Sequence, residues 1–117
     1  MKLTYIFLPI LIQLYSFSAV SGKKDIFLYP APGVICDTLA GYCADSEGIS
    51  LGLTRDFLGN NAEDVLEQKL GNTKNLKEFT LSNGVHCDSN ERQCYVERYY
   101  PRTEDKKERE FTNRLFN

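Results

Sequence analysis

Apolar residues dominate the start of the chain. Between positions 3 and 17 the run is interrupted only by Pro9, Gln13 and small hydroxylated residues, and a short, mostly small-residue stretch leads from it to Gly22. This order is typical of a cleaved secretory signal peptide, which we predict over residues 1–22. A retained anchor is the alternative, since about 20 apolar residues span a bilayer, but Pro9, Gln13 and the small-residue exit favour cleavage.

One pattern of apolar and polar positions then occurs twice. Residues 33–43 and 84–94 share Gly, Val, Cys, Asp and Cys at five of eleven positions, and together they contain all four cysteines. In each copy the first cysteine lies on a short run that leads into a turn, residues 38–41 or 89–92, and the second cysteine follows that turn. Such runs bounded by turn residues predict two strands joined by a tight connection. The sequence therefore predicts two similar β-hairpins.

The positions between the two copies have a helical pattern. A short helical turn is predicted between Thr54, as its N-cap, and Gly59, which ends it. A second helix is predicted over residues 62–70, capped by one of the two asparagines before it and stopped by the glycine after it. Its apolar edge is formed by Val65, Leu66 and Leu70.

The pattern changes at Pro101. Residues 95–100 predict a strand that continues the second hairpin until this proline, and Tyr95 and Tyr99 would then share one face. Residues 102–117 are rich in charge, and we predict a frayed, solvated terminus there. The alternative is an apolar side that docks on the domain or on a partner, formed by Phe111, Leu115 and Phe116.

These elements describe an α+β fold. We predict a small disulfide-stapled domain over residues 23–101, with two similar Cys-x6-Cys hairpins and a short helical segment between them. The predicted signal peptide precedes it, and a charged C-terminal tail over residues 102–117 follows it. Removal of the signal peptide leaves 95 of the 117 residues, a length at which one modest core benefits from covalent cross-links.

Four cysteines in an exported chain predict two disulfides, for which three connectivities exist. Closing a loop of about 8 residues within one copy contributes roughly 2.5 kcal/mol, whereas pairing across the copies closes a longer loop and contributes about 4 kcal/mol. Energy alone therefore does not select the pairing. Cysteines that face each other across a hairpin have Cα atoms roughly 4.5 Å apart, which a disulfide accepts. Geometry and the duplicated spacing favour Cys36–Cys43 and Cys87–Cys94.

The net charge of the chain indicates which classes of partner it can bind. The formal charge is −2, and it becomes −3 when Lys2 is removed with the signal peptide. A mildly acidic chain with mixed charges lacks the basic footprint of a nucleic-acid-binding protein. No second apolar span follows the signal peptide, so we predict no nucleic-acid partner and no stable membrane insertion after cleavage.

Six short motifs, taken together with their spacing, form a more specific pattern than any one of them alone. They are residues 32–37, 41–45, 48–50, 53–54, 57–59 and 82–88. This set resembles the YcgJ family, small exported proteins of Gram-negative bacteria that are related to a prophage-encoded protein and have no established activity. The similarity runs from about Tyr29 to Tyr99 and leaves the tail after Pro101 outside the pattern. The resemblance implies a periplasmic address and no cofactor, and it brings no catalytic residues.

A single histidine restricts the available chemistry. His86 can form neither a two-histidine metal site nor a histidine relay, and it corresponds to Ile35 of the first copy, on the side of the strand that we predict to be partly exposed. A zinc site with the cysteines would need reduced thiols, which export disfavours. We predict no catalytic residue, metal or cofactor. The alternative is a small hydrolase or metal-dependent enzyme that uses His86 with Asp88 or Glu91.

Asp37 and Asp88 follow the first cysteine of each copy. They could act as a pair of symmetry-related carboxylates. We favour a structural role, in which each aspartate begins its turn by accepting hydrogen bonds from backbone amides two residues further along.

The strongest candidate for a binding surface is a cluster of aromatic and basic residues. Tyrosine and arginine are enriched at binding hot spots, although tyrosine on a half-buried strand also serves in packing. We predict a partner-binding surface at Tyr95, Arg98, Tyr99 and Tyr100. The first hypothesis for function is thus a small, non-enzymatic periplasmic binding module that acts as an inhibitor or accessory of a protein in the cell envelope.

Overall fold

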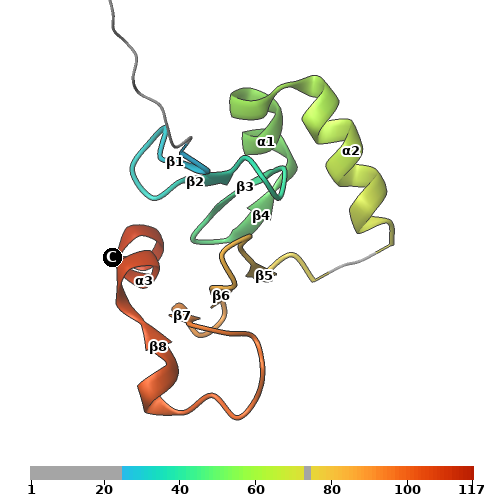
Figure 1. The fold of residues 1–117 in the computed structure, drawn as a ribbon. Coiled ribbons are helices and arrows are strands. Elements are labelled where there is room, and N and C mark those ends of the chain that lie inside the picture. Colours follow the sequence, from blue (N-terminus) through green and yellow to red (C-terminus); the bar gives the residue numbers. More distant parts are fainter. Residues whose placement is uncertain (1–24, 73–74) are drawn as a thin grey trace, which may run out of the picture.

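Each half of the chain forms an antiparallel four-stranded sheet (Figure 1). The computed structural model describes residues 25–72 and 75–117, so the predicted signal peptide lies outside the described residues. Strand order follows chain order in both sheets, and neighbouring strands are therefore joined by local connections. The α+β fold predicted from the sequence is confirmed.

The first sheet is followed directly by two helices. Its strands are β1 (Phe27–Leu28), β2 (Ile35–Asp37), β3 (Tyr42–Asp45) and β4 (Gly48–Ser50). The helices are α1 (Leu51–Leu58) and α2 (Asn60–Leu70). Both helices end where the sequence predicts, at the glycines in positions 59 and 71.

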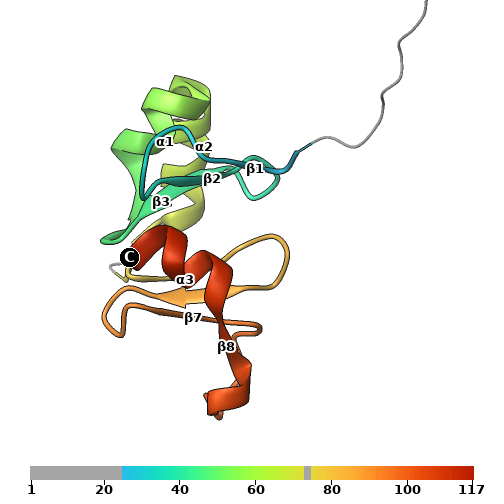
Figure 2. The same ribbon diagram turned by 90° about the vertical axis from the view of Figure 1, so that its left-hand side faces the viewer.

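The second sheet has the same order of elements with one helix after it. Its strands are β5 (Glu78–Thr80), β6 (His86–Asp88), β7 (Gln93–Tyr95) and β8 (Lys107–Glu108). A short 3-10 helix, η2 (Glu104–Lys106), precedes β8, and α3 (Arg109–Phe116) follows it. Figure 2 shows α3 beside the junction of the two sheets.

The two disulfides occupy equivalent places in the two sheets. Cys36 pairs with Cys43 across β2 and β3, and Cys87 pairs with Cys94 across β6 and β7, each with a Cα–Cα distance of 4.0 Å. All four side chains are fully buried. The predicted local connectivity is confirmed, and each bridge staples the central hairpin of its sheet.

The duplication extends beyond the cysteines into the helix that follows each sheet. In the first half, Thr54 accepts a hydrogen bond from the Cys43 amide (2.9 Å) and donates one to the Ser50 carbonyl (2.7 Å). In the second half, Thr112 accepts from the Cys94 amide (2.8 Å) and donates to the Glu108 carbonyl. Each threonine joins the first turn of its helix to the second cysteine, so the repeated unit is four strands and a helix.

Thr54 was predicted as an N-cap, and that prediction is wrong. The cap of α1 is Ser50, whose hydroxyl accepts from the Leu53 amide at 3.0 Å, and Thr54 is a fully buried residue within the helix. The N-cap predicted for α2 is also wrong, because α2 begins at Asn60 after Gly59, without a side-chain cap. Tertiary contacts of the Thr54 hydroxyl with the Cys43 amide, 11 residues away, explain the first error.

The frayed terminus predicted for residues 102–117 is also wrong. β8 pairs with β7, and α3 buries Phe111, Leu115 and Phe116 to 6% exposure or less. The ring of Phe111 meets that of Phe27 edge to face, with centroids 5.3 Å apart. The apolar side of this charge-rich segment therefore completes the core, and the folded domain continues past Pro101.

The two halves meet through strands β3, β4 and β5. The Tyr42 hydroxyl donates to the Thr80 carbonyl at 2.8 Å, and its ring packs edge-on against Phe79. The Ile49 amide donates to the Leu76 carbonyl at 2.9 Å. One continuous core of buried residues spans both halves, which makes the described chain a single folded unit.

Candidate functional site

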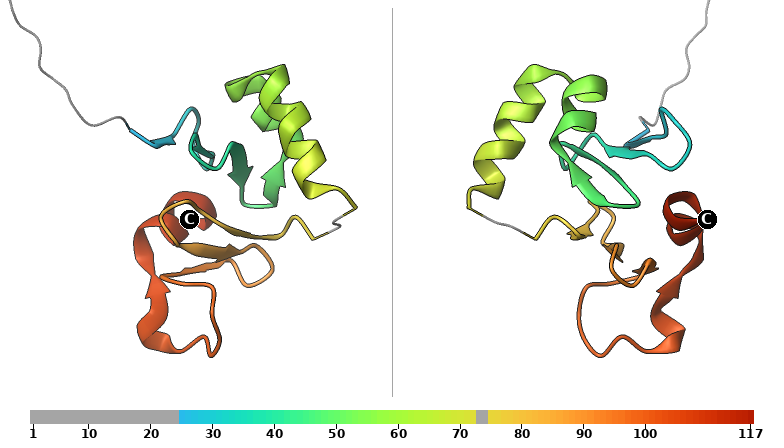
Figure 3. Two further views of the ribbon diagram at one scale, coloured as in Figure 1. Left: turned by 45° about the vertical axis from the view of Figure 1, so that its right-hand side comes forward. Right: turned by 180° about the vertical axis from the view of Figure 1, so that it is seen from behind.

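The candidate site is the loop that joins β7 to β8, residues 96–106, which we call the insert. In the first sheet Cys43 pairs with Ser50, and in the second Cys94 pairs with Glu108. The second connection is therefore seven residues longer by register. Figure 3 shows the insert projecting from the end of the molecule remote from α1 and α2. The first half has no counterpart of this longer connection.

Arg102 anchors the insert to the second sheet. Its guanidinium donates to Glu78 (2.9 Å), to Asp88 (2.9 Å) and to Glu91, and only 9% of its side chain is exposed. It also lies over the rings of Tyr95 and Tyr100, with its central carbon 5.2 and 4.7 Å from their centroids. A nearly buried arginine that meets three carboxylates is strongly held in one place.

The charges around Arg102 shift the acid–base properties of the cluster. Burial works to raise the pKa of Asp88, but hydrogen bonds from Arg102 and from the amides of Glu91 and Asn90 outweigh it and hold the pKa below its usual range. Burial lowers the pKa of Arg102, and the carboxylates more than reverse this. The hydrogen bond to Glu91, together with burial, raises the pKa of Tyr95 to about 12.

Beyond this anchor the insert presents exposed apolar and aromatic side chains. Val96, Tyr99 and Tyr100 are 51%, 61% and 70% exposed. The Arg98 guanidinium lies 5.3 Å from the centroid of the Tyr99 ring. Lys106 fixes the base of the insert by pairing with Glu97 at 2.9 Å. The insert thus holds two exposed tyrosines on a braced backbone.

The four residues predicted as a binding surface do not all lie together on the outside. Arg98, Tyr99 and Tyr100 are exposed on the insert. Tyr95 is 5% exposed, and its hydroxyl donates to Glu91. The predicted strand over residues 95–100 is wrong, because β7 ends at Tyr95 and the chain leaves the sheet there. The ring of Tyr95 instead packs against the guanidinium of Arg102.

His86 is buried, which corrects its predicted partial exposure. Its Nε2 lies 3.0 Å from Glu78 Oε1, and its Nδ1 lies 2.9 Å from the Thr80 hydroxyl. Within the described residues, the hydrogen bonds of His86 thus go to Glu78 and Thr80, whereas Asp88 and Glu91 are bound by Arg102. Glu78 Oε1 also accepts from Arg102, so among these hydrogen bonds His86 is linked to Asp88 and Glu91 only through Glu78 and Arg102.

The two turn aspartates share one role and differ in another. Asp88 accepts from the Asn90 amide, two residues on, at 2.9 Å, as predicted. Asp37 accepts at 2.9 Å from the Ala40 amide, three residues on instead of two, and it also organises its turn. The second oxygen of Asp88 binds Arg102, whereas that of Asp37 binds the Ser82 amide at 2.7 Å. One aspartate joins the two halves, and the other secures the insert.

The anchoring role of Arg102 is what sequence reasoning missed. Arg102 lies in a charged stretch that reads as solvated, and its three carboxylates come from β5, β6 and the following turn. The one available signal was the unequal spacing after the second cysteine of each copy.

No helix in residues 25–72 or 75–117 is long and apolar enough to cross a membrane. In that same part of the chain, no group of three or more His, Cys, Asp or Glu side chains could hold a metal ion.

Comparison with known proteins gives a family. The model of the YcgJ protein family matches residues 27–116. The chain belongs to the YcgJ family. It is 37% identical over 100 residues to the uncharacterized protein YcgJ of Escherichia coli strain K12. This alignment covers 86% of the present chain and 79% of the relative. No solved structure matches the chain.

Membership of the YcgJ family confirms the resemblance read from the six motifs. The matched region also extends past Tyr99 and includes β8 and α3. The C-terminal segment is therefore part of the YcgJ pattern, which corrects the expectation that it lies outside. Two fully buried disulfides indicate an oxidising, exported environment for this family member.

Proposed function

We propose that this YcgJ-family protein is a non-enzymatic binding module of the periplasm, exported by the signal peptide over residues 1–22, and that the insert binds a protein of the cell envelope. Such a module would act as an inhibitor of that protein or as its accessory. Supporting observations are the disulfides, the apolar N-terminal run, and the exposed aromatic side chains of the insert.

The observation that carries the proposal is the insert itself. It gives the second half a longer connection than the first half has, and it exposes Val96, Tyr99 and Tyr100. Tyrosine is among the residue types that are enriched at protein-binding surfaces. Tyrosine contributes large contact areas for little loss of conformational entropy.

Anchoring by Arg102 strengthens the proposal. A loop that is already ordered loses less conformational entropy when it binds than a flexible one does. Arg102 attaches the insert to β6 through Asp88, and the ion pair of Lys106 with Glu97 joins the two ends of the insert. The binding residues would therefore be presented in one conformation.

The test is cross-linking of the oxidised protein in periplasmic extract, read by quantitative mass spectrometry, with a variant of the insert. We expect one enriched partner, and a loss of capture of about tenfold or more in Arg98→Ala/Tyr99→Ala, because hot-spot residues carry most of the binding energy. The melting temperature should remain within about 2 °C of the parent, because these residues are exposed and distant from the core.

The matched control is Arg55→Ala/Phe57→Ala, which removes an arginine and a partly exposed aromatic residue from α1. It should capture the partner as well as the parent does. Equal capture by the parent and by the insert variant would contradict the proposed surface.

A further inference from the structure

The last strand of each sheet offers an edge to which further chain can be added. In the first half this strand is β4, and its Ile49 amide donates to the Leu76 carbonyl of the second half at 2.9 Å. The register of the two sheets places Lys107 of β8 at the position of Ile49. The edge of β8 is therefore the place at which a third unit would join the second.

The insert has taken up the backbone donor of this edge. The Lys107 N–H donates to the carbonyl of Glu104, within the short helix η2 of the insert. In the first half, the corresponding amide of Ile49 reaches the next unit instead. An unpaired strand edge is a template on which another chain can pair, and natural proteins cover such edges. The helix η2 thus removes the amide through which β8 would pair.

A side chain closes the same edge sterically. Lys106 stands at the position of Gly48, and its carbonyl accepts from the Val96 amide at 2.8 Å across the strands. In the first half, the Leu76 backbone fills the space that a Cβ atom at Gly48 would need. Lys106 carries that atom, and its ammonium pairs with Glu97 at 2.9 Å. Another backbone therefore cannot approach β8 as closely as the second half approaches β4.

The carboxylate of the neighbouring turn is closed as well. In the first half, Asp37 receives the docking segment of the second half, residues 79–85, through the amide and hydroxyl of Ser82. In the second half, the corresponding Asp88 is bound by Arg102 of the insert. The amide, the open space and the carboxylate that join the first half to the second are thus each closed in the second half by the insert.

We infer that the inner side of the insert, formed by Arg102, Glu104 and Lys106, protects the edge of β8 and prevents it from pairing with a second copy of this chain. The three features act independently on one edge, through an ion pair, a backbone hydrogen bond and a side chain. Lysine and covering segments are common devices by which proteins protect edge strands. This role goes beyond the proposed function, which concerns the exposed outer side of the insert.

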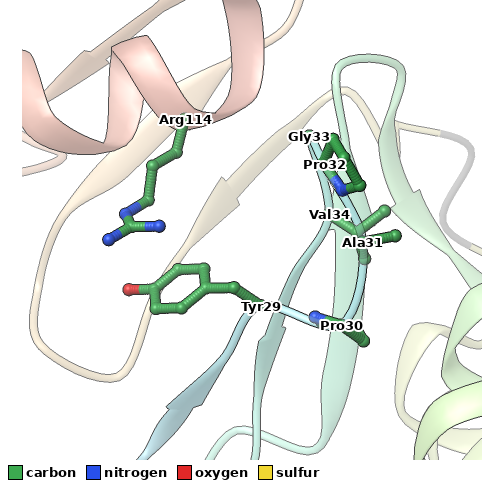
Figure 4. Close-up of a pocket in the computed structure, with 7 residues that line it drawn as sticks. All are labelled: Tyr29, Pro30, Ala31, Pro32, Gly33, Val34 and Arg114. Carbon is green, nitrogen blue, oxygen red and sulfur yellow. The ribbon is translucent and has the colours of Figure 1, made fainter.

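The opposite end of the molecule indicates how an uncovered β8 would pair. Residues 29–34 correspond to the docking segment at a shift of 51 positions. Their turn is closed by the Val34 amide on the Ala31 carbonyl, one residue later than the equivalent bond of the second half. Arg114 lies 3.8 Å from the centroid of the Tyr29 ring, beside a pocket of about 390 Å³ (Figure 4). Because this end does not present the same docking face, β8 would pair with β8 of the second copy in a two-fold arrangement.

The test is a chimera in which the sequence of residues 45–49 replaces residues 96–107. It restores the separation of seven positions between Cys43 and Ser50, and it places a glycine at the position of Lys106. Sedimentation should show a monomeric parent up to about 1 mM and a monomer–dimer equilibrium in the chimera with a Kd on the order of 1 mM or below, because a short edge forms a small interface. Circular dichroism and the mass of the oxidised chain verify its fold and its two disulfides.

The matched control is the same chimera with Gly48→Lys in the transplanted segment. Its connection has the same length but carries a side chain at the critical position, and it should remain monomeric. Arg98→Ala/Tyr99→Ala, which changes only the outer side of the insert, should also remain monomeric. A loss of partner capture in that variant, without self-association, separates this inference from the proposed function.

A measurement on the parent chain does not depend on the folding of the chimera. Its hydrogen exchange, followed by NMR, should be slowed at least about 100-fold at the Lys107 amide, because this amide is bonded to Glu104. Three results would overturn the inference. They are a folded chimera that stays monomeric, equal association of the chimera and its lysine control, and a Lys107 amide that exchanges as fast as in an unfolded chain.

Discussion

The two halves of this protein contain the same four strands, the same disulfide and the same threonine at the start of the following helix, yet they use one shared residue differently. Asp37 in the first half binds Ser82 of the second, and Asp88 in the second half binds Arg102 of its own insert. The first aspartate has an internal docking partner. For Asp88, the second aspartate, Arg102 of the insert is the partner instead.

This difference shows how a two-unit repeat can be closed at one end. In a chain of two such units, the surface of the last unit that would bind a following unit has no partner. Repeat proteins cover such surfaces with atypical terminal segments. Arg102 and the insert cap the second unit. The matching segment of the first unit, around Leu28 and Tyr29, remains exposed, so the two ends of the molecule differ in chemistry although the units are alike.

Reduction of both disulfides should have the largest effect. Each bridge closes a loop of about 8 residues, so we expect the free energy of unfolding to fall by about 2.5 kcal/mol per bridge and about 5 kcal/mol in total. Urea unfolding of Cys36→Ala/Cys43→Ala and Cys87→Ala/Cys94→Ala measures the two contributions separately. A difference above about 1 kcal/mol between these variants would contradict their equivalence.

Arg102→Leu should destabilise the fold by about 3 kcal/mol, because it leaves the buried carboxylate of Asp88 without its ionic partner. Arg98→Leu, which changes an exposed arginine of the same insert, should alter the free energy of unfolding by less than about 0.5 kcal/mol. Chemical denaturation of both variants provides the comparison. Equal, small losses would show that the insert is not held by the cluster.

Replacing the two equivalent threonines tests the extent of the duplication. Thr54→Val and Thr112→Val each leave a cysteine amide without its acceptor, and we expect each to lower the free energy of unfolding by about 1 to 2 kcal/mol. Thr54 is the more deeply buried of the two, so its loss should be the greater. A thermal melt of each variant is sufficient, and no loss in Thr112→Val would restrict the repeat to the sheets.

The smallest expected effect is a dependence of stability on acid pH. The folded pKa of Asp88 lies below its ordinary value, so its contribution is complete above about pH 5 and is lost as the pH falls through the folded pKa. Unfolding measured between about pH 5 and pH 2 should show a shallower decline in Asp88→Asn than in the parent. Parallel curves would contradict this assignment.

Local signals predicted the parts of the fold that local chemistry determines. The hairpins follow from the duplicated spacing of the cysteines, and α1 and α2 end at glycines that can adopt positive φ, with observed values of 104° for Gly59 and 54° for Gly71. The pairing of the cysteines followed from the same spacing. In each of these cases the residues that decide the structure lie within a few positions of one another.

The errors concern residues whose partners are distant in sequence. Phe111 packs on Phe27, 84 positions earlier in the chain. The charged segment alone therefore did not decide between a frayed terminus and the apolar side given as the alternative. Arg102 reaches carboxylates on three separate parts of the second sheet, and no window of sequence shows that they converge. The exposed part of the candidate site, Arg98, Tyr99 and Tyr100, was identified by residue type alone.

The close contact at Gly48 has a mechanical consequence. A Cβ atom at this position would lie 2.2 Å from the Leu76 carbonyl oxygen, so the backbones of the two halves touch directly. The neighbouring hydrogen bond from Ile49 to Leu76 fixes the spacing of the two backbones at the same place. Any side chain at position 48 would therefore have to push the two halves apart, so the junction of the sheets depends on the one residue type that has no Cβ atom.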